Sequence, residues 1–312
     1  MYSGIVNIYK EQGFTSHDVV AKLRGIYGQK KVGHTGTLDP MAEGVLIVCL
    51  GQATKLSDLI LTSKKQYIAT MKLGISTDTD DVTGNVIGKY KDEYLRSLAY
   101  MGSEESFRAR ATEVASEFLG NSMQIPPMYS AIKVNGKKLY EYARAGQVIE
   151  REERPIEIYK LDILETNLND LTVKFAVECS KGTYIRSLIR DMGDMLGTYA
   201  TMSALLRDEV SGMNYKDGYR LDDLQKLKDS GKLEETVLPM DKLLSDVPKA
   251  EVKPSGQKLL ANGNRLKESD LDYAEESDVK NASFIRIYEG TELKALYSYD
   301  KNKNDFKVYK ML

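Results

Sequence analysis

The sequence has few of the residues from which metal sites and disulfide frameworks are built. Its 312 residues include no tryptophan, two cysteines, Cys49 and Cys179, and two histidines, His17 and His34. No pair of these side chains has the spacing of metal ligands, and two distant cysteines do not make a disulfide framework. We therefore expect no metal site and a reducing cellular compartment.

Long apolar runs and targeting signals are also missing. No segment approaches the roughly 20 consecutive apolar residues that cross a bilayer, and the first residues do not resemble a secretory signal. The glycine-rich stretch near residue 35 lacks the Gly-x-x-x-x-Gly-Lys-Ser/Thr pattern that cradles phosphates. We therefore expect a cytoplasmic protein without a membrane segment and without a Walker-type nucleotide site.

The most informative stretch is residues 33–40, with the sequence GHTGTLDP. Two glycines and a proline predict a loop, and the apolar run at residues 44–50 predicts a buried strand directly after it. His34 and Asp39 are therefore ionisable groups beside the core, where a carboxylate loses hydration and needs a partner or a purpose. An ordinary connecting loop with an Asp-Pro turn explains the same composition.

Apolar periodicity outlines the elements around this loop. It predicts a strand at residues 3–9, a helix that Ser16 caps and Gly28 ends, and a strand from Tyr67 to residue 73. The run TDTDD at residues 77–81 does not match a calcium loop, and we interpret it as a solvated or capping acidic turn. A clean alternation at residues 171–179 predicts another strand, which a helix follows after Arg186.

Cations gather in two parts of a chain whose formal net charge is −2. Lysine and arginine outnumber the acids over residues 1–72, so a mildly acidic protein can still present a basic face. At residues 121–151 cations alternate with tyrosines after a stiff double proline, and Asn135-Gly136 predicts a tight turn. This mixture suits phosphates and exposed bases, although surface helices also have it.

The end of the chain has a different pattern. Asp246-Val247-Pro248 is a candidate domain boundary, and short apolar runs follow it at residues 284–288, 293–299 and 306–309. We expect a small β-rich domain of about 65 residues, near the lower size limit for independent folding.

Three motifs, in this order, resemble the signature of the bacterial tRNA pseudouridine-55 synthases (TruB type). They are HTGTLDP with AEGVL at residues 34–46, IPPMYSAIK at residues 125–133 with Gly136, Tyr140, Ala143 and Arg144 after it, and KGTYIR at residues 181–186. The resemblance implies an α+β fold with a mixed, mostly antiparallel sheet and flanking helices. It also implies a catalytic domain at 1–247 with an RNA-clamping segment at about 121–151, and a PUA-like RNA-binding domain at 248–312.

The resemblance also implies the reaction. One uridine in the T-loop of tRNA, at position 55, is flipped out and isomerised to pseudouridine, which requires no cofactor because no atoms are gained. The family's essential aspartate falls on Asp39, as nucleophile or base. Arg186 is suited to keep this carboxylate ionised, since a guanidinium opposes the pKa rise that burial causes. Tyr67 falls where the family has a tyrosine that stacks on the base.

Further substrate contacts follow from the same resemblance. His34 matches the residue that fills the space left by the flipped base, and Tyr184 and Leu205 match residues that line the uridine pocket. Lys10, Lys133 and Arg144 are expected to contact the RNA. The implied partner is the T-stem-loop of tRNA, with a monomeric enzyme and no obligate protein partner.

Two departures from the family pattern affect local RNA contacts rather than the chemistry. Lys10-Glu11 stands where the family has Lys-Pro, and Leu205-Leu206-Arg207 stands where it has Leu-Arg-Arg. Three other functions remain open at this point. They are an RNA-binding protein with a silent pocket, a synthase that depends on a guide RNA and partner proteins, and a metal hydrolase built on His34 and Asp39.

Overall fold

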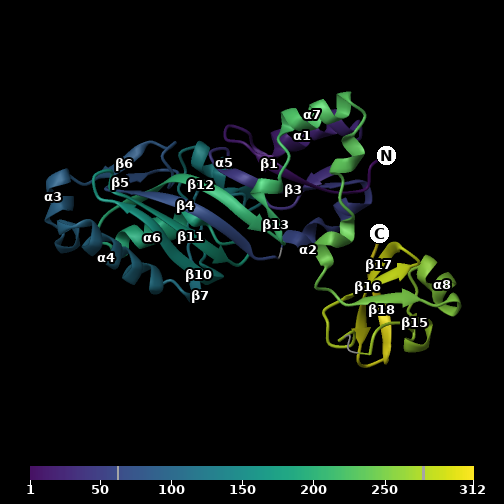
Figure 1. Cartoon of the computed structure of the whole chain (residues 1–312). Coiled ribbons are helices and arrows are strands. Elements are labelled where there is room, and N and C mark those ends of the chain that lie inside the picture. The colour runs from purple at the N-terminus through teal and green to yellow at the C-terminus, as the bar shows by residue number, and fades with distance from the viewer. Residues whose placement is uncertain (62, 276–277) are drawn as a thin grey trace.

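The computed structural model describes residues 1–61, 63–275 and 278–312, and a long twisted sheet forms its centre (Figure 1). The strand order is β1-β3-β12-β4-β11-β10-β7, with β2 added to β3 and β13 added to β12. All these pairs are antiparallel except β12 with β3. The expected mixed, mostly antiparallel sheet is therefore confirmed. Its strands are β1 (Gly4–Lys10), β2 (Val32–His34), β3 (Glu43–Leu50), β4 (Lys65–Leu73), β7 (Gly120–Gln124), β10 (Arg154–Asn167), β11 (Thr172–Cys179), β12 (Ala200–Val210) and β13 (Met213–Asn214).

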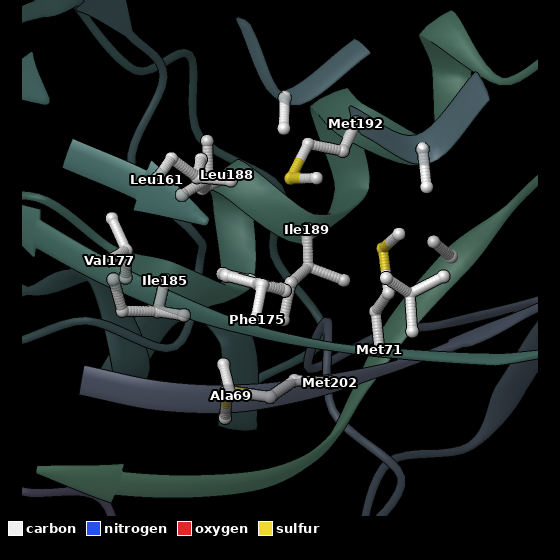
Figure 2. Packing of buried hydrophobic residues seen from close by; sticks show 14 of the residues in the cluster. Ala69, Met71, Leu161, Phe175, Val177, Ile185, Leu188, Ile189, Met192 and Met202 are labelled. Atoms are coloured by element: carbon white, nitrogen blue, oxygen red, sulfur yellow. The ribbon is translucent and has the colours of Figure 1, made fainter. Parts of the chain in front are cut away.

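Alternating side chains give the sheet one apolar face, which helix α6 (Ile185–Met195) covers. Every second residue of β4 is buried, as the period-two pattern requires. The buried side of α6 packs on this face in the largest core cluster. Figure 2 shows residues of this contact, among them Met71, Phe175 and Val177 from the sheet and Ile185, Leu188, Ile189 and Met192 from the helix. Helix α6 is thereby fixed on the sheet, and its N-terminal turn carries Arg186.

Helix α1 (Ser16–Tyr27) packs on the other end of the sheet and ends at Gly28 in the left-handed conformation, as expected. The N-cap is Thr15, in a capping box with Asp18, so the prediction that Ser16 caps the helix was wrong by one residue. The Ser16 hydroxyl instead accepts from the Leu38 N–H at 2.9 Å and is 3.2 Å from the Leu38 carbonyl oxygen. Helix α1 therefore holds the loop that carries Asp39.

Smaller elements surround the sheet. The turn predicted at Asn135-Gly136 is confirmed, since both residues have positive φ, 49° and 82°. It joins two very short strands within the segment expected to clamp RNA. The remaining helices of this part are α2 (Ser57–Leu61), α3 (Asp92–Ser97), α4 (Glu104–Ser116), α5 (Leu139–Arg144) and α7 (Leu221–Asp229), and the short strands are β5 (Ile75–Thr77), β6 (Val86–Lys89), β8 (Lys133–Val134) and β9 (Lys137–Lys138).

A second sheet forms the compact lobe at the C-terminal end (Figure 1), in the order β15-β14-β16-β17-β18. The lobe has its own core cluster, and the three strand-like runs expected there correspond to β16, β17 and β18. The β-rich C-terminal part is thus confirmed, while the boundary between 247 and 248 stays a prediction. Its elements are β14 (Lys249–Val252), α8 (Pro254–Ala261), β15 (Leu271–Asp272), β16 (Ile285–Glu289), β17 (Glu292–Asp300) and β18 (Asp305–Met311).

Candidate active site

The loop at residues 33–40 leads from β2 into the buried strand β3, as its sequence predicts. The Thr35 N–H donates to the Ile47 carbonyl at 2.9 Å, and the Gly13 N–H donates to the Pro40 carbonyl at 2.8 Å. Together with the Ser16 hydroxyl at Leu38, these bonds fix the backbone on both sides of Asp39. The carboxylate is therefore presented by a well-supported loop rather than by a free connection.

Asp39 forms an ion pair with Arg186. The distance from the Arg186 Nη2 to the Asp39 Oδ2 is 3.0 Å, and the two side chains are 5% and 35% exposed. The guanidinium is itself held by backbone, since it donates to the carbonyl oxygens of Thr79 at 2.9 Å and Tyr129 at 2.8 Å. The buried Arg186 guanidinium is thus paired with an Asp39 carboxylate that is still partly exposed to solvent.

The acidic run at residues 77–81 is the capping turn rather than the solvated turn of the two expected alternatives, since its carboxylates accept from the backbone N–H groups of Asn85 and Thr83. Asp81 is 5% exposed, and its Oδ2 lies 3.8 Å from the Arg186 Nη1. The other oxygen accepts from the Thr79 hydroxyl at 3.0 Å and from the Thr83 N–H at 2.9 Å. The turn is therefore folded inward around Arg186, which lies between two carboxylates.

The charges around Asp39 oppose one another. Burial raises the pKa of Asp39 above its ordinary value, and Arg186 opposes this most strongly. Asp81 raises the pKa of Asp39 further and Lys10 lowers it. Burial outweighs the guanidinium, so the ion pair limits the rise in the pKa without abolishing it.

Tyr67 and Leu205 lie on adjacent central strands and pack in one core cluster with Leu38 from the loop. In the register of β4 and β12, Tyr67 is the partner of Arg207. Burial raises the pKa of the Tyr67 phenol to about 12, with the Arg207 guanidinium opposing. The hydroxyl is therefore a neutral hydrogen-bonding group at ordinary pH.

Tyr184 precedes the first turn of α6, two residues before Arg186. The Gln124 side chain fixes its backbone, because the Gln124 amide donates to the Tyr184 carbonyl at 3.1 Å and accepts from the Tyr184 N–H at 2.8 Å. Burial raises the pKa of the Tyr184 phenol, and Arg186 and Asp39 are both close enough to act on it electrostatically. Tyr184 thus belongs to the same site as Asp39.

His34 lies at the start of the loop, half-buried, with its ring edge-to-face with His17 at 5.3 Å between centroids. Burial, together with smaller effects of the nearby His17 and Arg207, lowers the pKa of His34 to about 4. A neutral, flat imidazole is therefore present at physiological pH.

Lys10 does not occupy the place expected of an RNA contact. The side chain is fully buried, and its amine donates to the carbonyl oxygens of Phe14 at 2.7 Å and Glu11 at 3.1 Å, with Pro40 at 3.4 Å. Burial lowers the pKa of Lys10 to about 8, while Asp39 raises it. Lys10 thus bonds the backbone at Pro40, directly after Asp39. Its side chain is fully buried and is not accessible to a phosphate of the RNA.

Lys133 and Arg144 lie elsewhere, exposed on β8 and α5 within the segment at residues 121–151 that is expected to clamp RNA. On this segment the Tyr140 ring has cations beside it, with the Lys138 amine 5.3 Å and the Arg144 guanidinium 5.2 Å from its centroid. The structure gathers Asp39, Tyr67, Arg186, Tyr184 and Leu205 in one site and places these cations on a separate segment.

Sequence reasoning missed two charged residues of the site. Asp81 gave no signal of burial, because acidic turns have the same composition when they are solvated. Arg207 was named in the sequence analysis only within the Leu205-Leu206-Arg207 departure, although it bonds the loop that carries Asp39. Among the described residues, no three His, Cys, Asp or Glu side chains converge as metal ligands. No helix in the described ranges is long and apolar enough to span a membrane.

Comparisons with known proteins identify the family of the chain. The profile of the TruB family pseudouridylate synthases, N-terminal domain, matches residues 24–185, and that of the tRNA pseudouridylate synthase B C-terminal domain matches residues 186–245. The tRNA pseudouridine synthase B of Lachnoclostridium phytofermentans is 46% identical over 99% of both chains. That of Alkaliphilus oremlandii is 47% identical over 85% of this chain and 83% of the relative.

Solved structures of similar fold include a Cbf5–Nop10–Gar1 complex. Its matching chain has a TM-score of 0.72 and 27% identity, covering 99% of this chain and 84% of that one. An H/ACA RNP bound to a substrate RNA containing 2'-deoxyuridine matches with a TM-score of 0.69 and 25% identity, at 99% and 84% coverage. With family profiles over most of the chain and full-length relatives above 40% identity, the chain belongs to the TruB family of pseudouridylate synthases.

Proposed function

We propose that this chain converts the uridine at position 55 in the T-loop of tRNA to pseudouridine, with Asp39 as the essential carboxylate. The observation that carries the proposal is the ion pair between Asp39 and the buried Arg186, at 3.0 Å, beside Tyr67 and Tyr184. The names of the relatives, tRNA pseudouridine synthase B, support tRNA as the substrate.

The reaction needs an ionised carboxylate in a sheltered place. The uracil leaves its sugar at N1, turns and reattaches through C5, which then loses its hydrogen as a proton. Asp39 acts as the nucleophile or as the base in this sequence. Arg186 and Lys10 favour the charged form of Asp39, while burial and Asp81 keep its pKa raised, which makes the carboxylate more basic than one in water.

The base must leave its stack to reach Asp39, at a cost of a few kcal/mol. Tyr67 offers a flat, uncharged ring for the flipped base, and Leu205 and Tyr184 complete the pocket wall. We assign the neutral His34 ring to the space that the base vacates. These assignments use only groups that lie around the loop at residues 33–40.

The RNA arm extends beyond this pocket. We propose that the exposed cations of the clamping segment, Lys133 and Arg144 among them, bind its phosphates. We also propose a domain boundary between 247 and 248, with residues 248–312 forming a PUA-like RNA-binding unit. A tRNA-modifying role agrees with the cytoplasmic location expected from the sequence.

A tritium-release assay tests the proposal, because only catalysis frees the hydrogen at C5. We expect the purified protein to release tritium from [5-³H]uridine tRNA, and Asp39→Asn to lose at least about 1,000-fold in rate. Tight tRNA binding should survive, since Asn keeps the shape of the side chain. Tritium release at the normal rate by the Asp39→Asn protein rules out the catalytic assignment, and no release by the wild type favours an RNA-binding protein with a silent pocket.

A second candidate is a synthase that works only within a larger assembly, because the similar solved structures are of complexes with named partners. The identities favour the first candidate, since the relative of Lachnoclostridium phytofermentans, at 46% over 99% of both chains, exceeds the structural neighbour at 27%. Activity of the purified chain alone on a T-arm transcript excludes a guide RNA and an obligate protein partner.

A further inference from the structure

We propose that Arg207 is a positioning residue that holds Asp39 and Tyr67 at a fixed position relative to each other. The proposal rests on the proposed function, because that function assigns the two residues to the uridine reaction. Arg207 lies on β12 and is 1% exposed. By volume it is the largest fully buried side chain among the described residues. A buried guanidinium of this kind requires an explanation, because desolvating a charge costs several kcal/mol.

The donors of Arg207 bond backbone carbonyls on both sides of Asp39. Its Nε donates to the Val45 carbonyl at 2.7 Å, its Nη2 to the Gly36 carbonyl at 3.1 Å and its Nη1 to the Thr37 carbonyl at 3.3 Å. Gly36 and Thr37 precede Asp39 in the same loop, and Val45 follows it on β3. One planar fork thus bonds both arms of the chain around Asp39, which a single-point ammonium cannot do.

The same guanidinium also lies beside the tyrosine. Tyr67 is the Cα partner of Arg207 in the register of β4 and β12, and its phenol raises the pKa of Arg207 against the lowering by burial. The partners of the charge are therefore three backbone carbonyls and one phenol. Arg207 joins the Asp39 loop to the strand that carries Tyr67, two residues beyond Leu205.

This role differs from that of Arg186. The charges that act most strongly on Asp39 are those of Arg186, Asp81 and Lys10. Arg207 instead bonds the backbone on both sides of Asp39, so we infer that it acts on Asp39 mainly by holding this backbone. A displacement of about 1 Å at a reacting group can cost about 100-fold in rate. Loss of the fork should therefore slow the chemical step and leave the ionisation of Asp39 unchanged.

The test compares Arg207→Lys with Arg108→Lys. Arg108 is the control, because its guanidinium also donates to two backbone carbonyls, those of Ile163 at 2.9 Å and Leu164 at 3.1 Å on β10, but it lies on the exposed side of helix α4. Single-turnover tritium release and T-arm RNA affinity are measured with the full chain, well below each melting temperature. We expect Arg207→Lys to slow the single-turnover rate constant about 100-fold with an affinity within about threefold of wild type. Arg108→Lys should match wild type in both.

Two further readouts separate positioning from general damage to the fold. The acid limb of the pH–rate profile should stay in place in Arg207→Lys, because the charges facing Asp39 are intact. In the Tyr67→Phe background, which lacks the hydroxyl, Arg207→Lys should cost only about tenfold, because coupled residues are not additive.

The proposal is overturned if the rate constant of Arg207→Lys stays within about threefold of wild type, or if weaker RNA binding accounts for the whole loss. It is also overturned if the loss is the same in both Tyr67 backgrounds. Failure of the proposed function is a different result, namely no tritium release by the wild type or full release by Asp39→Asn.

Discussion

At the scale of single residues, the site is built on a conflict between burial and charge. In the proposed reaction the Asp39 carboxylate must be ionised, yet its surroundings raise its pKa. Arg186 is the strongest opposing influence, and its own position depends on the carbonyl oxygens of Thr79 and Tyr129 and on Asp81. The reactivity of one carboxylate is thus set by groups from three distant parts of the chain.

This conflict predicts the pH dependence of the reaction. The rate should fall as the pH drops through the raised pKa of Asp39, because the protonated carboxyl is inactive. Arg186→Gln removes the main group that lowers this pKa, so the acid limb should move to higher pH, whereas Arg186→Lys keeps a positive charge and should move it less. Single-turnover tritium release across the pH range measures the limb. An acid limb of Arg186→Gln at or below the wild-type position contradicts the prediction.

At the scale of elements, the close approach of β12 to β3 depends on one glycine. Gly44 has φ of 103°, and a Cβ there would lie 2.3 Å from the Arg207 carbonyl oxygen and 2.9 Å from its nitrogen. Both atoms belong to the backbone of a paired strand, so moving them away would cost hydrogen bonds of the sheet. Gly44 therefore permits the strand pairing that brings Arg207 under the Asp39 loop.

We expect Gly44→Ala to lower the free energy of unfolding by about 2 kcal/mol or more, from steric overlap and the left-handed backbone together. Gly25→Ala is the control, since Gly25 lies on the exposed side of α1 with nothing within 4 Å of its Cβ position. Alanine there should stabilise the helix by about 0.5–1 kcal/mol. Thermal unfolding measures the stability of both variants. Equal melting temperatures for the two would contradict the role assigned to Gly44 in the approach of β12 to β3.

The clamping segment carries a prediction about RNA binding. Lys133→Ala and Arg144→Ala each remove an exposed cation, so each should weaken T-arm binding and reduce the slope of log affinity against log salt by about 1. The rate at saturating enzyme should hardly change, because neither residue lies beside Asp39. Binding isotherms at several salt concentrations supply the slope, and a slope equal to that of wild type means that these cations do not contact phosphate.

The sequence predicted the elements well where a pattern is local. The alternation in β4, the capping glycine of α1, the Asn135-Gly136 turn and the loop before β3 all follow from neighbouring residues. The pairing of Asp39 with Arg186 also agreed with expectation, through a resemblance that includes both motifs.

Three features of the site were not predictable, because they depend on contacts between distant residues. Arg207 bonds Gly36 from 171 positions away, and nothing near it in the sequence indicates burial. Asp81 lies in a run whose composition fits solvent equally well. Lys10 ends a strand, where a lysine is normally exposed, and besides the nearby Glu11 and Phe14 carbonyls its amine bonds the Pro40 carbonyl, 30 positions away.

At the scale of the whole molecule, the C-terminal lobe is packed against the rest of the chain through an apolar contact. Tyr288, Leu293 and Leu296 from the lobe share a core cluster with strand β3 residues and with Leu244. Lys310 adds an ion pair with Asp58 at 2.6 Å, and Lys55 donates to the Met311 carbonyl at 3.1 Å. Fully buried apolar side chains on both sides indicate a fixed attachment rather than a flexible tether.

Deletion of residues 248–312 tests this attachment. The cut should expose the β3 side of the shared cluster, where Ile47 and Cys49 have no exposed surface in the whole chain. We expect a lower melting temperature, binding of an apolar dye and a tendency to aggregate, because burial of such surface stabilises by about 25 cal/mol per Å². Lys310→Ala is the control, since removal of a partly exposed ion pair should cost less than about 1 kcal/mol. A truncated chain that melts like the full one and binds no dye shows instead that residues 1–247 fold without the lobe.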